Sequence, residues 1–150
     1  MKVVIQRVSE AKVEIDNKEV AAISNGYLLL LGINAEDIEE DVDWLVPKIV
    51  KLRIFSDEQG MMNKNIQEID GNIIVVSQFT LFASTKKGNR PSFLQSARPD
   101  IAIPLYEQFK AKIEKELGKT IQSGIFGADM KVSLTNDGPV TIIIDSKDKI

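Results

Sequence analysis

Hydroxyl and amide side chains follow the most hydrophobic β-like run of the sequence. Ser77, Gln78 and Thr80 come at or directly after the run Asn72–Ser77, whose centre reads Ile-Ile-Val-Val and fits a strand that is buried on both faces. A group at the end of a buried strand is rigidly supported, as a catalytic or binding site requires. Without a nearby base, however, a serine or threonine hydroxyl is a weak nucleophile. The pattern therefore allows either a hydrolase-like strand end or a strand terminus whose side chains cap backbone groups.

The composition excludes several common kinds of catalysis. The chain has no histidine and no cysteine, so it cannot carry a Ser-His-Asp or Cys-His site or an ordinary zinc site built from those residues. It has no GxxxxGK[ST] or GxGxxG motif, which argues against nucleotide-driven chemistry. The acidic residues between positions 37 and 43 are typical of one solvated helix face. We therefore expect no metal and no cofactor, which leaves hydroxyls, amides and the backbone for chemistry.

A second candidate is the turn sequence Asp137-Gly138-Pro139. It separates two alternating β-like runs, Lys131–Asn136 and Val140–Asp145, and predicts a hairpin. Only about 5–6% of X-Pro bonds in folded proteins are cis. The residue types alone therefore predict a turn but not a cis peptide.

Positive charge is concentrated in one segment of an acidic chain. The net charge is -3 at pH 7, which argues against binding of nucleic acid over the whole surface. From Ile73 to Pro99 there is no Asp or Glu, and the basic residues in this stretch are Lys86, Lys87, Arg90 and Arg98. Clusters of this size are common on solvated loops. If RNA is a ligand, the contact must be local.

The pattern of apolar residues predicts one α+β domain over residues 1–150, in which 43% hydrophobic residues suffice for a single core. The first third predicts a meander of antiparallel strands. Its four runs are Lys2–Val8, Ala11–Ile15, Glu19–Ile23 and Gly26–Ile33. With the later strands and two helices, this order predicts a curved antiparallel sheet or a β-barrel-like domain.

Two segments have the spacing of amphipathic helices. Apolar residues from Ile38 to Leu52 predict one helix, which Pro47 should kink or shift in its start. A second helix is expected over Ile101–Leu117, with Asp100 as its N-cap and Gly118 as its stop. Pro104 is expected in its first turn.

No segment is expected to cross or enter a membrane. The longest apolar run, around Tyr27–Leu31, is far shorter than the roughly 20 residues that span a bilayer. Arg7 interrupts the apolar N-terminal stretch, unlike the apolar region of a secretory signal. We therefore expect a cytoplasmic protein.

Taken together, the two candidate motifs resemble those of the D-aminoacyl-tRNA deacylase family, which carries an SQxTL-type segment and an NxGPxT-type segment. Here they stand as Ser77–Leu81 and Asn136–Thr141. The segments Val4–Val8 (VIQRV), Lys87–Phe93 (KGNRPSF) and Phe126–Met130 (FGADM) also look like the family. The similarity therefore spans nearly the whole chain.

The resemblance implies a homodimeric, β-barrel-like enzyme that removes D-amino acids from tRNA without a cofactor. Its active site would lie at the subunit interface, where the turn of one chain reaches into the pocket of the other. The Gly138–Pro139 peptide would be cis, with carbonyl oxygens that hold the substrate ammonium group and block the side chain of an L-amino acid. Glycine has no side chain to clash, so glycyl-tRNA would be accepted to some degree.

The resemblance also implies roles for single residues. Ser77, Phe79 and Thr80 would orient the ester, with backbone N–H groups near Phe79 as oxyanion donors and the 2′-OH of the RNA helping to activate water. Thr80 as a covalent nucleophile is the competing mechanism. Gln78 would stabilise the pocket by hydrogen bonds. The residues that would line the adenosine or side-chain region are Ala102, Phe126 and Met130.

Two further assignments concern basic residues. Lys86, Lys87 and Arg90 are the candidate RNA contacts, whereas Arg7 would be a structural charge near the interface or simply a paired arginine at a strand end. A non-catalytic module that uses the basic cluster to hold an acceptor stem remains an alternative function, as does a general esterase that ignores the RNA.

Overall fold

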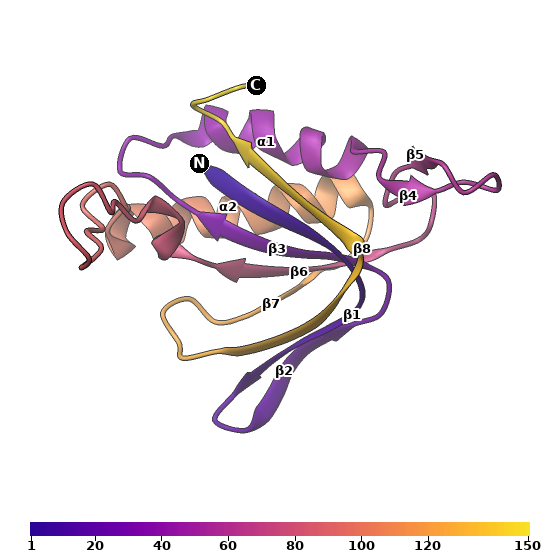
Figure 1. The fold of residues 1–150 in the computed structure, drawn as a ribbon, viewed down its shortest axis with the longest axis horizontal. Helices are drawn as coiled ribbons and strands as arrows, with labels where there is room; N and C mark the ends of the chain where they lie inside the picture. The colour runs from indigo at the N-terminus through magenta and orange to yellow at the C-terminus, as the bar shows by residue number, and fades with distance from the viewer.

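A long bent strand organises the sheet in the computed structural model, which describes residues 1–150. Strand β1 (Lys2–Ile15) pairs through its first half with β3 (Gly26–Gly32) and through its second half with β2 (Lys18–Ile23), both antiparallel. Along its other edge, β1 pairs with β8 (Lys131–Asp145), which is one residue longer. Figure 1 shows β1 and β8 bending together through the middle of the molecule.

The other side of the sheet is parallel. Strand β6 (Asn72–Ser77) pairs parallel with β3, and the two-residue β7 (Gln122–Ser123) pairs parallel with β6. The outer strands of this row approach each other, because the Ala22 backbone N–H donates a hydrogen bond of 2.7 Å to the Gln122 side chain. The predicted curved, barrel-like α+β sheet is therefore confirmed, although it is mixed rather than wholly antiparallel.

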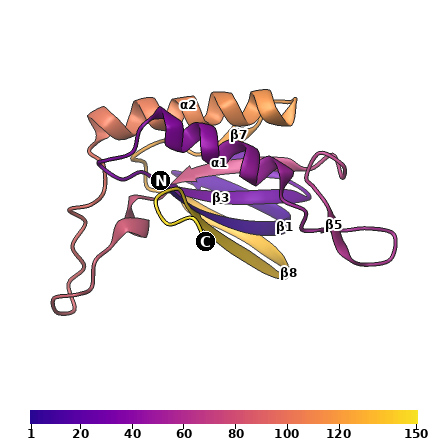
Figure 2. The ribbon, with the colours of Figure 1, turned by 90° about the horizontal axis from the view of Figure 1, so that it is seen from above.

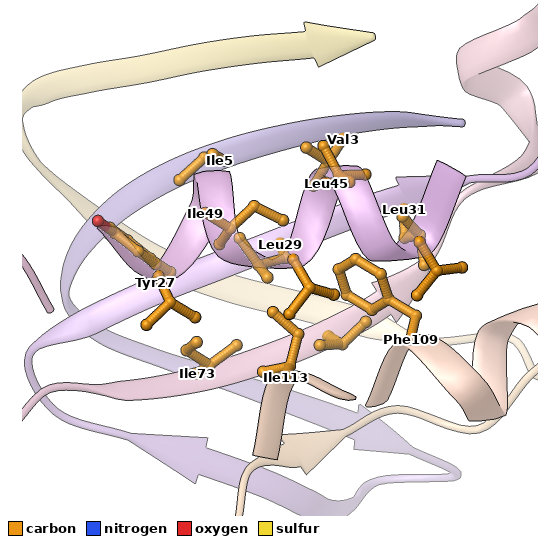
Figure 3. Close-up of a cluster of buried hydrophobic side chains, with 14 of the residues drawn as sticks. Val3, Ile5, Tyr27, Leu29, Leu31, Leu45, Ile49, Ile73, Phe109 and Ile113 are labelled. Carbon is orange, nitrogen blue, oxygen red and sulfur yellow. The ribbon is translucent and has the colours of Figure 1, made fainter. Parts of the chain in front are cut away.

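Two helices cover one face of the sheet, α1 (Glu39–Lys51) and α2 (Pro99–Leu117). Figure 2 shows them side by side above the strands. Apolar side chains from the helices and the strands meet between the two layers. Figure 3 shows this for Leu29, Leu45 and Phe109, which are fully buried. A smaller apolar cluster fills the curl of the sheet on its other face, and its buried members are Val8, Ala11, Val13, Ala21, Leu28, Ile74 and Val76.

The remaining elements are short and lie at opposite ends of the molecule. A hairpin of β4 (Phe55–Ser56) and β5 (Met62–Lys64) projects on one side. The one-turn helix η1 (Phe79–Phe82) follows β6 on the other side. No helix combines the length and the apolar character needed to cross a bilayer.

Two strand predictions were wrong. The runs Lys2–Val8 and Ala11–Ile15 form one strand, and β3 returns to pair with β1, so the first third is not a simple meander. Residues Lys131–Asp145 form a single strand rather than a hairpin, because both halves run antiparallel to β1. The turn residues are instead accommodated as a bulge, where the register shifts between the pairs that Gln6 and Val8 make with β8.

The predicted helices are confirmed, but their starts differ from the prediction. Helix α1 begins at Glu39 and continues through Pro47. Helix α2 begins at Pro99 with Arg98 as N-cap, so Asp100 is not the cap, and Pro104 lies beyond the first turn. Gly118 ends the helix as predicted, with a left-handed φ of 85° and an N–H that donates to the Glu114 carbonyl.

A buried polar network joins the start of α1 to the end of the chain. Asp41 accepts hydrogen bonds from the Ile38 backbone N–H (2.9 Å), the Ser146 hydroxyl (2.6 Å) and Lys147 (2.9 Å). Asp37 pairs with the α-ammonium group of Met1 at 2.5 Å. Asp37 and Asp41 are only 4% and 7% exposed, so the acidic run is not a single solvated face.

This network should make stability depend on pH. Burial raises the pKa of Asp41, but hydrogen bonds from Ser146, Ile38 and Lys147 outweigh it and lower the pKa to about 2. A lowered folded-state pKa contributes stability above the unfolded-state value of about 3.9, and this stability is lost as the pH falls toward 2. Asp41→Asn should therefore lower the free energy of unfolding by about 2 kcal/mol at pH 7.

Urea unfolding of both proteins between pH 7 and pH 2.5 measures this difference. The difference in free energy of unfolding between the unaltered protein and Asp41→Asn should shrink steadily below pH 4. Asp43→Asn is the matched control on the same helix, because Asp43 is 56% exposed and pairs with Lys112 at the surface. A loss in Asp41→Asn that does not change with pH would show that the carboxylate charge is not what the network stabilises.

Candidate active site

The end of β6 and the start of η1 are held by backbone hydrogen bonds. The Gln78 N–H donates to the Leu31 carbonyl at 2.8 Å, which extends the pairing of β3 and β6 by one more bond. The chain then turns sharply, since the Leu81 N–H donates back to the Gln78 carbonyl at 3.2 Å. The segment of hydroxyl and amide side chains therefore begins on a buried strand and ends on a tight helical turn.

Gly32 allows η1 to pack closely against the end of β3. A Cβ atom at this position would lie 3.0 Å from the Leu81 Cβ and 3.1 Å from the Gln78 carbonyl oxygen. Nine in ten real Cβ contacts are longer than these distances. The absence of a side chain at Gly32 thus determines how near the turn can sit to the sheet.

A pocket of about 320 Å³ opens at this strand end. It is within the size range of small-ligand sites. Its walls come from β3, β6, η1, the start of α2 and the segment before β8. The lining residues that the sequence singled out are Ser77, Gln78, Phe79, Ala102, Phe126 and Met130. The fold therefore brings together residues that lie far apart in the chain.

Thr80 lies outside the pocket lining. It is exposed, and its hydroxyl accepts a hydrogen bond from the Gln78 side-chain amide. The Phe79 carbonyl accepts one from the Ser96 hydroxyl at 2.8 Å. Gln78 and Ser96 thus hold the turn in place from two sides.

Several lining residues were missed by the sequence analysis: Leu31, Ile33, Val76, Ala97, Gly127, Ala128, Asp129 and Val132. Three of them lie within the segment Phe126–Met130, where the resemblance was the only signal. The apolar ones carry no signal, because a residue that lines a pocket and a core residue look alike in sequence.

The lining offers little for acid–base chemistry. Asp129 is its only ionisable side chain; its carboxylate is 89% exposed and lies 3.3 Å from Lys131. No group of three or more acidic residues is placed to hold a metal ion. What the pocket can do is enclose an apolar group, orient it with the Ser77 hydroxyl and backbone groups, and exclude part of the solvent.

The turn at Gly138–Pro139 is built by a bulge in β8. Its peptide bond is cis, as the resemblance implies. Gly138 has a φ of 141°, and a Cβ there would lie 2.8 Å from the Val140 side chain and 3.0 Å from the Arg7 guanidinium. The Asn136 side chain accepts from the Val140 N–H at 2.7 Å. The backbone conformation therefore requires glycine at position 138, and the Asn136 side chain supplies an acceptor that holds the bulge.

Arg7 stabilises this bulge from β1. Its guanidinium donates to the Asp137 carbonyl at 2.8 Å and also to the Ile54 carbonyl. It forms no ion pair with a carboxylate, so the interpretation of Arg7 as a paired arginine was wrong. Arg7 instead joins the turn to the chain that leads into β4.

The turn and the pocket of one chain lie at opposite ends of the same strands. The bulge is level with Tyr27 on β3, because Tyr27 pairs with Arg7, whereas the pocket is level with Leu31, which pairs with Ser77. The four residue steps from Tyr27 to Leu31 span roughly 13 Å at about 3.3 Å per residue. Figure 1 shows the bend of β8 at the end of the sheet away from η1.

The candidate RNA contacts lie in the segment between η1 and α2, which forms a loop that projects from the body of the molecule in Figure 2. Two hydrogen bonds between Ser84 and Ser92, of 2.8 and 2.9 Å, close the loop at its base. Lys86, Lys87 and Arg90 lie beyond this pair, are exposed, and form no ion pair. Their charge is therefore available to a ligand.

The fold is a curved mixed sheet with a pocket at a strand end and a cis Gly-Pro bulge. Because the chain has no histidine, a hydrolase site of this kind would have to use hydroxyls, amides and backbone groups. The sequence model of the family described as D-Tyr-tRNA(Tyr) deacylase matches residues 4–145, and the chain belongs to this family. Proteins named D-aminoacyl-tRNA deacylase are similar to it over nearly their whole length. The one from Cytophaga hutchinsonii is 65% identical over 146 residues (97% of each chain), and that from Flavobacterium johnsoniae is 60% identical over 149 residues (99% of each).

Solved structures share the fold. One titled "c-Myc DNA Unwinding Element Binding Protein" is 39% identical, with a TM-score of 0.89 and coverage of 97% of this chain and 98% of the other. A second, titled "Structural Analysis of a probable eukaryotic D-amino acid tRNA deacylase", has a TM-score of 0.82 and covers 95% of this chain and 97% of the other. Its identity is 18%, so this second likeness supports the fold alone.

Proposed function

We propose that this chain, as a single domain over residues 1–150, hydrolyses the ester bond of D-aminoacyl-tRNA to free amino acid and tRNA. The observation that carries the proposal is the pocket at the end of β6, where Ser77, Gln78 and Phe79 meet the segment Phe126–Met130. Family membership and relatives named D-aminoacyl-tRNA deacylase at 60% to 65% identity support it. Such a reaction belongs to translation proofreading in the cytoplasm.

The proposed chemistry needs no acid–base side chain. An aminoacyl ester is already activated, and the terminal ribose carries a vicinal hydroxyl, so positioning can supply much of the rate. Ser77 and Phe79 would orient the ester from the pocket lining, and Thr80, outside the lining, would contribute through its backbone N–H and its hydrogen bond with Gln78. The first N–H groups of a helix have no partner within it, so those of Phe79 and Thr80 can stabilise the oxyanion. The substrate 2′-OH would then help to activate water.

Thr80 as a covalent nucleophile is the competing mechanism. The structure argues against it on two grounds: Thr80 lies outside the pocket lining, and its hydroxyl is bonded to an amide rather than to a base. An amide nitrogen cannot remove a proton, and an unactivated hydroxyl is a poor nucleophile.

The two mechanisms differ in the group whose removal stops the reaction. Under the proposed mechanism, Thr80→Ala should keep kcat within a few-fold of the unaltered enzyme. A D-tyrosyl-tRNA with a 2′-deoxy terminal adenosine should react about 100-fold more slowly, as expected when a proton-transfer group is lost. Single-turnover rates measure both effects.

Thr85→Ala, on the exposed loop, is the matched control for the loss of a threonine hydroxyl. An inactive Thr80→Ala together with normal turnover of the deoxy substrate would establish Thr80 as the nucleophile instead.

Selection of handedness is assigned to the Gly138–Pro139 turn of a second subunit. Two enantiomers carry the same groups, so they can be separated only by a clash or an unmade contact. A rigid main-chain wall suits this task, and the bulge is held by Arg7 and Asn136. The turn is exposed and cannot reach the pocket of its own chain, which favours a homodimer in which the turn enters the partner's pocket.

Sedimentation equilibrium tests the dimer directly. It should give about 33 kDa, twice the 16.7 kDa of one chain, as for a closed two-fold assembly. If the enzyme has the mass of one chain at the concentrations where it is active, the turn of one subunit cannot enter the pocket of another, and this part of the proposal fails.

Hydrolysis of D-tyrosyl-, L-tyrosyl- and glycyl-tRNA tests the function itself. D-Tyrosyl-tRNA should react fastest, and the L enantiomer about 100-fold more slowly, equivalent to about 2.7 kcal/mol of transition-state stabilisation. Glycyl-tRNA should react at an appreciable rate, because it has no side chain to clash. Equal rates on the two tyrosyl enantiomers would refute the chiral filter.

A non-catalytic RNA-binding module is the second candidate function, favoured by the unpaired charges of Lys86, Lys87 and Arg90. Binding of charged tRNA without release of amino acid from D-tyrosyl-tRNA would select it. A general esterase would instead hydrolyse small activated esters and be indifferent to the RNA.

A further inference from the structure

We propose that Phe93, held against Phe79 at the mouth of the pocket, is a stacking platform for the unpaired bases that precede the terminal adenosine of the tRNA. This proposal rests on the proposed function and specifies how the single-stranded 3′ end of the substrate is held outside the pocket.

The two phenylalanine rings form an exposed aromatic pair. Their centroids are 5.1 Å apart and their planes meet at 72°, in an edge-to-face arrangement. Phe79 is 56% exposed and Phe93 is 37% exposed. Because an edge-to-face contact uses only one ring face, the pair leaves aromatic faces open. Phe79 lines the pocket and Phe93 does not, so the pair leads outward from the pocket.

The loop that carries Phe93 is attached to the site on both sides of this residue. Ser96 donates to the Phe79 carbonyl at 2.8 Å, and the Ala97 N–H donates to the Ile33 carbonyl at 2.8 Å. On the other side, Ser92 is bonded to Ser84 at the base of the projecting loop. A ring between such attachments is ordered before a ligand arrives, which lowers the entropic cost of binding.

The charges on the same loop complement a nucleic-acid backbone. Arg90, Lys87 and Lys86 lie further toward the tip of the loop than Ser92, and none of them is paired with an acidic side chain. The whole stretch from Ile73 to Pro99 contains no Asp or Glu. Proteins hold single-stranded RNA by stacking its bases on aromatic rings and by placing basic side chains next to its phosphates. Outward from the strand end, the site consists of the pocket, the aromatic pair and the basic tip of the loop. In the proposal, the pocket holds the terminal adenosine, the aromatic pair stacks the preceding bases, and the basic tip contacts their phosphates.

The test compares a substrate that has these bases with one that lacks them. The substrates are D-tyrosyl-tRNA and the 3′-O-D-tyrosyl ester of adenosine, and the variant is Phe93→Ala. Loss of one base stack should raise KM for the tRNA about tenfold with kcat unchanged. Both constants for the adenosine ester should stay at their original values. Phe93→Trp, which keeps an aromatic ring at this position, should have the KM of the unaltered enzyme for the tRNA.

Leu94→Ala is the matched control, because Leu94 is the adjacent side chain and is 92% exposed. An unchanged KM of Phe93→Ala for the tRNA would overturn the proposal. An equal rise for the adenosine ester would also overturn it, since that would show a damaged pocket rather than a lost stack. If the unaltered enzyme hydrolyses neither substrate, the proposed function itself has failed.

Salt dependence separates the two parts of the surface. Replacing Lys86, Lys87 and Arg90 together by glutamine should flatten the dependence of kcat/KM on salt concentration, whereas Phe93→Ala should leave the slope unchanged. A slope that flattens in Phe93→Ala would show that the ring acts through the charges and not by stacking, and would overturn the assignment.

Discussion

The pairing of β3 with β6 is the interaction on which the rest of the molecule depends. Both strands are buried on both faces, between the helices and the curl of the sheet. The pairing continues for one bond past the end of β6, from the Gln78 N–H to the Leu31 carbonyl. That last bond places the first residues after the strand against the core. The hydroxyl and amide side chains of the candidate site are therefore positioned by the main chain of this ladder.

The sequence was informative where one local pattern decides the structure. The apolar run of β6, the helical spacing in α1 and the left-handed stop at Gly118 all depend on neighbouring residues, and each was predicted. The strand end of the candidate site could be located for the same reason. Its roles for single residues rested on the resemblance, since hydroxyls at a strand end have more than one use.

The failures concern contacts between residues far apart in the chain. A Gly-Pro sequence usually marks a turn between two strands, but here Arg7 bonds the Asp137 carbonyl across 130 positions and both flanking runs stay on β1. The acidic run of α1 looked solvated because Asp41 has its partners, Ser146 and Lys147, at the other end of the chain. The apolar residues of the pocket could not be predicted for a related reason. A valine or leucine that lines a pocket cannot be distinguished in the sequence from one in the core.

A single guanidinium also links two separate parts of the surface. Arg7 holds the carbonyl of Asp137 and the carbonyl of Ile54, the residue before β4. The β4–β5 hairpin and the Gly138–Pro139 bulge therefore share one mechanical link. A force or a bound molecule that displaces the hairpin would also tilt the bulge. In the proposed function, where the bulge selects handedness, stereochemical accuracy would therefore depend on a hairpin that lies outside the pocket.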